Sequence, residues 1–131
     1  MAKQSQPPRF LAAVQDLFFV GKISAAAKRV GIPVEILPNE SQILQAAKSS
    51  ASVVLVDLNA SGLRPLDLIR KLKENGTPSS QDQPVQVLAF FSHVQEDLKR
   101  EADKAGCDLV LPRSVFFQQL DDLLRQRSCH L

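Results

Sequence analysis

The sequence predicts a single α/β domain in which a parallel sheet lies between two layers of helices. Short apolar runs typical of buried strands alternate five times with longer stretches of helical periodicity. Regular alternation of this kind implies parallel strands joined by right-handed crossovers. The length of 131 residues and a hydrophobic share of 44% suit one domain with one core.

Two strand–helix units occupy the first part of the chain. Residues 10–14 predict an apolar strand, and apolar residues at helical spacing follow over residues 19–30. Gly31 comes next, and glycine readily adopts the left-handed conformation that ends many helices. Residues 33–37 predict a second strand, and Asn39 is expected to cap the following helix through its side-chain oxygen.

The third unit contains the most informative residue of the sequence. Residues 53–58 are apolar except for Asp57, whereas a buried parallel strand is normally apolar throughout. Helical periodicity resumes at residues 63–72, after a short turn. Because α/β proteins place their ligand crevice at the carboxyl ends of parallel strands, an acid there indicates function rather than stability.

The last two units follow a polar loop at residues 75–84. Residues 85–91 predict the fourth strand, and a largely charged helix is expected at about 95–105. Residues 108–111 predict the fifth strand, and residues 114–126 predict the fifth helix. No internal repeat and no second domain are expected.

Composition limits the classes of function that are open to this chain. The formal net charge is +2 with both signs interleaved, so no basic stripe for nucleic acid is expected. The apolar runs are too short to cross a membrane, and residues 1–8 lack the apolar core of a signal peptide. We therefore expect a cytoplasmic protein with a tail at 1–8, one domain at 9–126 and a second tail at 127–131. Cys107 is expected to pack as a small apolar residue.

Four segments of the chain resemble the receiver domain of bacterial two-component response regulators, over roughly residues 9–126. The segment DLNASGLRPLDLIRKL matches the phosphoacceptor segment without a gap and places Asp57 on the phosphorylated aspartate. LAFFSH places Ser92 on the family's hydroxyl residue, and AGCDLVLPRS places Arg113 on its lysine. VQD, residues 14–16, matches the end of the first strand, where the family has two acids. The resemblance implies the flavodoxin-like (βα)5 fold, a three-layer sandwich with sheet order 2-1-3-4-5.

The same resemblance implies a set of site residues. Asp57 would accept a phosphoryl group as a nucleophile, and Ser92 and Arg113 would contact that group. Mg²⁺ would be held by Asp16, Asp57 and the backbone carbonyl of Asn59. The predicted metal site is weak, because the neutral Gln15 replaces an acid in a site that depends on charge.

Several residues depart from the family pattern in this one site. Arg113 replaces a lysine with a planar guanidinium, and Ser114 replaces a proline. Val110 occupies the position of the aromatic switch residue. His93 follows the hydroxyl residue, where an imidazole could gate access of the phosphoryl donor or of water. With Gln15, these departures indicate an atypical receiver, or pseudo-receiver.

Each site residue also has a purely structural interpretation. Asp57 could be a strand-end acid satisfied by backbone amides, and Asp16 could cap the first helix. Ser92 could cap the fourth helix, and Arg113 could form a structural ion pair with Asp57 or Asp16. His93 could be an ordinary loop histidine.

The fifth helix suggests a surface for protein contacts. Phe116 and Phe117 are adjacent, so a helix cannot direct both side chains into the core. The resemblance implies contacts through the fourth helix, fifth strand and fifth helix, either with a second copy in a homodimer or with a histidine kinase or other signalling protein. A position at the edge of the core remains the alternative for these rings.

Three functions are therefore compared. We favour a single-domain atypical receiver that acts in signal transduction through protein contacts, with degenerate or phosphorylation-independent switching. The first alternative is a receiver that takes phosphate at Asp57 from a histidine kinase. An enzyme or a carrier of flavin or nucleotide is less expected, because Phe18 and Phe19 follow the first strand in place of a glycine-rich phosphate loop.

Overall fold

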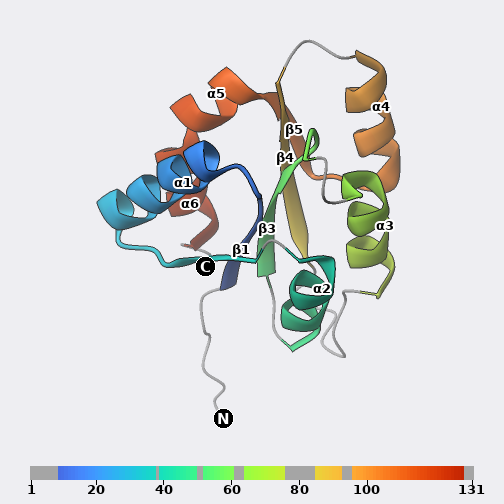
Figure 1. Ribbon diagram of the computed structural model, residues 1–131, viewed down its shortest axis with the longest axis horizontal. Coiled ribbons are helices and arrows are strands. Elements are labelled where there is room, and N and C mark those ends of the chain that lie inside the picture. Colours follow the sequence, from blue (N-terminus) through green and yellow to red (C-terminus); the bar gives the residue numbers. More distant parts are fainter. Residues whose placement is uncertain are drawn as a thin grey trace.

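The computed structural model describes residues 9–37, 39–49, 52–60, 64–75, 85–92 and 96–128. Strands and helices alternate along these residues and form a sheet with helices on both faces (Figure 1). The elements are β1 (Arg9–Ala13), α1 (Leu17–Val30), β2 (Val34–Ile36), α2 (Glu40–Ser49), β3 (Ser52–Asp57), α3 (Pro65–Asn75), β4 (Gln86–Phe91), α4 (Glu96–Ala105), β5 (Leu109–Pro112), α5 (Arg113–Gln118) and α6 (Leu120–Ser128).

The sheet has the predicted order, β2-β1-β3-β4-β5, and each neighbouring pair is parallel. In the middle of the sheet, Leu55 pairs with Ala12 on one side and with Leu88 on the other. Helices α1, α5 and α6 cover one face, and α2, α3 and α4 cover the other (Figure 1). This arrangement confirms the flavodoxin-like α/β fold.

Each face of the sheet has its own hydrophobic core. Consecutive strand residues point to opposite faces, so Val54 and Leu55 are both buried but belong to different cores. One core packs against α2, α3 and α4, and the other packs against α1, α5 and α6. The continuous apolar runs in the sequence therefore reflect burial of the central strands on both sides.

Local capping residues act as the sequence predicts. Gly31 ends α1 in the left-handed conformation, with φ at 73°. The side-chain oxygen of Asn39 accepts a hydrogen bond from the Ser41 N–H at 2.8 Å, next to the start of α2. Both caps are specified by short sequence patterns and do not depend on tertiary contacts.

The fifth helix differs from the prediction, because it is divided into α5 and α6. Gln119 lies between them with φ at −100° and ψ at 4°, although the segment contains neither glycine nor proline. The Gln119 N–H still donates to the Val115 carbonyl at 3.0 Å, and the Leu123 N–H donates to the Gln119 carbonyl at 2.9 Å. The break therefore costs few backbone hydrogen bonds, and α6 continues to Ser128.

No helix in the described part of the chain is both long and apolar enough to span a membrane.

Candidate functional site

Asp57 is the last residue of β3 and lies at the carboxyl edge of the sheet. Its neighbour in the ladder is Phe90 of β4, and only 5% of its surface is exposed. One carboxylate oxygen accepts a hydrogen bond from the Asn59 N–H at 2.9 Å. The backbone amide interaction expected for a structural strand-end acid is thus present, and it also holds the carboxylate in a fixed orientation.

The surroundings of Asp57 make its carboxyl group harder to ionise than that of a free aspartate. Burial has the largest influence and raises the pKa of Asp57, and the negative charge of Asp16 raises it further. The hydrogen bond from Asn59 and the positive charge of Arg113 oppose this rise in pKa without cancelling it. Asp16 and Arg113 therefore lie close enough to Asp57 for their charges to act on its carboxyl group.

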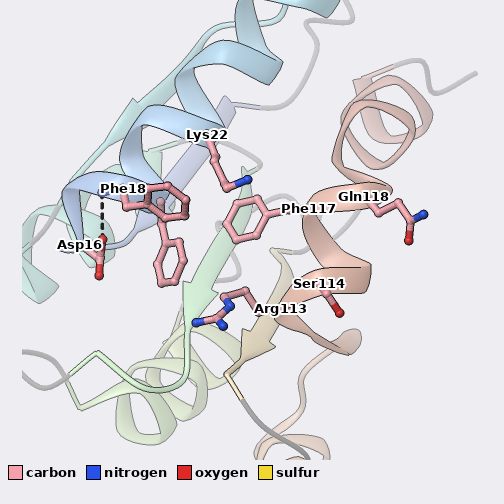
Figure 2. A pocket seen from close by; sticks show the side chains of 8 residues that line it. Asp16, Phe18, Lys22, Arg113, Ser114, Phe117 and Gln118 are labelled. Atoms are coloured by element: carbon pink, nitrogen blue, oxygen red, sulfur yellow. Dashed lines mark hydrogen bonds between the residues drawn. The ribbon is translucent and has the colours of Figure 1, made fainter.

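Asp16 is exposed and caps α1, which confirms its structural interpretation. Its side-chain oxygen accepts a hydrogen bond from the Phe18 N–H at 2.8 Å (Figure 2). An acid at this position is also stabilised by the dipole of the helix. Metal binding by Asp16 would therefore use a carboxylate that already accepts the capping hydrogen bond of α1.

The donor set around Asp57 fits a Mg²⁺ ion only weakly. Asp16 and Asp57 supply two carboxylates, and Asn59 is placed beside them by its hydrogen bond to Asp57. Mg²⁺ can be held by one or two carboxylates together with water. In the residues that the structure describes, no group of three or more His, Cys, Asp or Glu side chains could hold a metal ion. Gln15, which follows β1, provides no charge to strengthen the site.

Ser92 is connected to the loop after β3 and not to the fourth helix. Its backbone N–H and its hydroxyl group both donate to the side-chain oxygen of Asn59, at 2.7 Å and 3.1 Å. Because α4 begins at Glu96, Ser92 lies too early in the chain to be its N-cap. The capping interpretation of Ser92 is therefore wrong, and Asn59 links Ser92 to Asp57.

Arg113 does not form the structural ion pair that the sequence suggested. No carboxylate of the described residues lies within ion-pair distance of its guanidinium, although its charge is felt at Asp57. The guanidinium carbon lies 5.5 Å from the centroid of the Phe19 ring, in a cation–π geometry. The side chain is thus held by α1, while its charge acts on Asp57 only from a distance.

A groove lies beside this edge of the sheet, between the first turn of α1 and α5 (Figure 2). It encloses about 620 Å³, and its lining includes Asp16, Phe18, Lys22, Arg113 and Phe117. Sequence reasoning did not single out Lys22 or this groove. The pattern that could have found it is Phe18, an aromatic residue outside the apolar stripe of α1.

The two aromatic residues of α5 have different environments. Phe116 is fully buried, and its ring lies 4.7 Å from that of Phe90. The expectation that Phe116 contributes to an interaction surface is therefore wrong, because the ring completes the core next to α1 and α6. Phe117 is half-buried, packs against the same core and lines the groove. Its helix, α5, lies on the face of the sheet opposite α4 (Figure 1).

Two further departures from the family pattern can be placed. Val110 is buried in β5, so an aliphatic residue fills the position of the aromatic switch residue. Ser114 is exposed in the first turn of α5 and lines the groove. His93, the candidate for gating the site, lies outside the described residues.

Comparison with solved structures finds response regulators with a similar fold. A response regulator receiver domain from Bermanella marisrubri is 26% identical, with a TM-score of 0.71 over 93% of this chain and 98% of that one. A response regulator from Thermotoga maritima is 18% identical, with a TM-score of 0.72 over 92% and 96% of the two chains.

A third structure is the receiver domain of a sensor histidine kinase from Pseudomonas aeruginosa, described with magnesium coordinated in its active-site cleft. It is 17% identical, with a TM-score of 0.73 over 94% of this chain and 98% of that one. No family model matches the sequence, and no curated protein matches it significantly. The structural comparison nevertheless confirms the resemblance found in the sequence: over nearly its whole length, this chain has the CheY-like fold of the response regulator receiver domains.

Proposed function

We propose that this chain acts in signal transduction as an atypical receiver, through protein–protein contacts that do not require phosphorylation of Asp57. The observation that carries the proposal is the position of Arg113. Its guanidinium lies over the Phe19 ring and makes no ion pair with Asp57 within the described part of the chain. A phosphoryl group on Asp57 would need a cation close to its oxygens, because it adds negative charge to a buried site.

The acidic side of the site supports the same proposal. Asp57 is buried and burial raises its pKa, so this site disfavours the additional negative charge that a phosphoryl group would bring. Asp16 is engaged in capping α1, and Gln15 adds no charge. Val110 leaves no aromatic ring in β5 to change position when Ser92 moves.

Phosphorylation at Asp57 is the second candidate, and the linked residues Asp57, Asn59 and Ser92 favour it. An Asp57 oxygen would attack the phosphorus of a phosphohistidine on a kinase, the imidazole would leave, and an acyl phosphate would form. A divalent cation held by Asp16, Asp57 and the Asn59 carbonyl would supply charge neutralisation when bound. Ser92 would contact the new group, and its connection to Asp57 through Asn59 supports this role.

An amide NMR titration with Mg²⁺, followed by beryllofluoride, separates the two candidates. Wild type and Asp57→Ala are compared, with Asp103→Ala as a control that removes an exposed acid on α4. The proposal predicts that the three proteins respond alike, with no saturable shifts around Asp57. Saturable shifts that occur in wild type and Asp103→Ala but disappear in Asp57→Ala would establish the phosphoacceptor function instead.

A further inference from the structure

We propose that the groove between α1 and α5 binds an acidic peptide segment of a partner protein, anchored by an aromatic or leucine side chain. This inference rests on the proposed function, because it names the kind of partner through which the domain would act. It concerns residues outside the Asp57 site, apart from Asp16 and Arg113 at the shared edge.

The first argument is the exposure of apolar side chains at the start of α1. Leu17 is 84% exposed and Phe18 is 67% exposed, and they are the exposed large hydrophobic residues of the described chain. Neither is needed for the core, which α1 contacts through Phe19, Ile23 and Ala26. Adjacent exposed apolar residues beside a groove are typical of a surface that a partner covers.

The second argument is charge complementarity. Lys22 and Arg113 line the groove, and no carboxylate within the described residues lies within 4 Å of either cation. The acid of the groove, Asp16, is engaged as the cap of α1, and α1 itself contains no acidic residue. Carboxylates of a partner would therefore meet unpaired positive charge at this surface.

Aromatic rings lie directly beneath these cations. The Lys22 ammonium lies 5.1 Å from the centroid of Phe18 and 5.7 Å from that of Phe117 (Figure 2). Arg113 extends from the start of α5 toward α1 in the same view and stacks on Phe19. A bound segment could thus place an apolar side chain against the rings while its carboxylates reach the cations. This combination selects an acidic segment with an apolar anchor.

The third argument is Gly21, in the middle of α1. Glycine in an exposed helix interior destabilises the helix relative to alanine. Nothing in the fold requires it, because an added Cβ would meet no atom within 4 Å. Gly21 lies one turn after Phe18 and next to Lys22, so the missing side chain leaves room for a partner to approach the backbone beside the groove.

A second copy of this chain is a less suitable occupant. In a symmetric dimer, the same patch faces itself across the two-fold axis. Lys22 and Arg113 of one copy would then lie close to the same cations of the other, without acids on α1 to balance them. An acidic partner avoids this repulsion.

A random peptide display library is the first probe, selected against the folded wild-type chain. We expect the enriched peptides to be rich in Asp and Glu around a Phe, Trp or Leu. A selected peptide is then synthesised, and its dissociation constant is measured for wild type and for variants. Lys22→Glu and Phe18→Ser should each weaken binding by about tenfold or more. Gly21→Leu should weaken binding while the melting temperature is retained or raised, because leucine favours the helix more than glycine does.

The controls distinguish the groove from general charge effects. Lys28→Glu makes the same change of net charge on the same helix, but outside the groove, and should leave the dissociation constant nearly unchanged. Asp57→Ala should bind the peptide as wild type does, so that failure of this inference is distinguishable from failure of the proposed function. Higher salt should weaken binding, because the groove cations are exposed to solvent screening.

Three results would overturn the inference. Enriched peptides could be basic or apolar without acids, or Lys22→Glu and Lys28→Glu could have equal effects. Sedimentation could also reveal a wild-type dimer that Phe18→Ser dissociates, which would assign the groove to a second copy of the chain.

Discussion

The hydroxyl group of Ser92 donates a hydrogen bond to the side-chain oxygen of Asn59, and the Ser92 N–H donates to the same atom. These two bonds join the end of β4 to the loop that follows β3. The Asn59 N–H in turn donates to Asp57. The three residues therefore form a connected polar chain at the carboxyl edge of the sheet, and its middle member is Asn59.

Removing this acceptor should loosen the site. Asn59→Ala leaves the N–H and the hydroxyl of Ser92 without their shared partner, and we expect a loss of about 0.5–1.5 kcal/mol in the free energy of unfolding, because water can reach these exposed groups. Asn59→Asp retains a side-chain oxygen and should lose less. Urea unfolding at neutral pH measures both changes. Equal losses for the two variants would indicate that the loss of stability does not come from removing the side-chain acceptor of Asn59.

The raised pKa of Asp57 leads to a prediction about pH. Because the pKa is higher in the folded state than in the unfolded state, the folded protein binds more protons between the two values. Stability contributed by protonated Asp57 is present at low pH and is lost as the pH rises from about 4 through the folded pKa.

The test of this prediction is a comparison of wild type with Asp57→Asn, which stays neutral at every pH. The free energy of unfolding of wild type, measured relative to the variant, should fall as the pH rises through that window and then level off. The difference removes the contributions of other acids, such as Glu35, whose pKa is lowered by its hydrogen bond to Arg9. A difference that rises with pH would show that Asp57 is stabilised as a carboxylate.

Much of the fold could be predicted because it depends on local patterns. The buried strands are continuous apolar runs, and Gly31 and Asn39 act as caps through their own backbone or side chain. Each predicted strand begins and ends within one residue of the observed strand. The break at Gln119 was not predictable, because no glycine or proline marks it and its neighbours keep helical hydrogen bonds.

The site was less predictable, because its contacts join distant segments. The sequence placed Asp57, Ser92 and Arg113 at one edge of the sheet through their positions at strand ends. It did not reveal that Asn59 would hold Ser92, or that Arg113 would stack on Phe19. These details depend on side-chain rotamers and on how closely α1 approaches α5. No pattern in a single sequence predicts either of them.

Cys107 should be chemically inert in the folded protein. Burial raises the pKa of its thiol to about 11, and the thiol donates weakly to the carbonyls of Val87 and Leu109. The reactive thiolate is therefore scarce at pH 8. In a Cys129→Ser background, where Cys107 is the remaining thiol of the two in the sequence, reaction with an aromatic disulfide should be slow and should accelerate on unfolding. Fast reaction before unfolding would contradict its burial.

Restoring charge to the site should restore cation binding if the departures from the family pattern explain its weakness. Gln15→Asp adds a carboxylate beside Asp16, and Arg113→Lys replaces the stacked guanidinium with a compact ammonium. The double variant should show saturable Mg²⁺-dependent amide shifts around Asp57 that are absent in wild type, because a third acid strengthens a site for a hard cation.

The single variants separate the effect of the added carboxylate at position 15 from that of the changed cation at position 113. Gln15→Asp alone should gain Mg²⁺ binding, whereas Arg113→Lys alone should change binding little, since it adds no ligand. Beryllofluoride should then bind more tightly to the double variant than to Gln15→Asp, because the lysine can move away from Phe19 toward the new anion. If the double variant remains silent toward Mg²⁺, the charge deficit at Gln15 does not account for the atypical site. The restraint on cation binding would then lie in the burial of Asp57 itself.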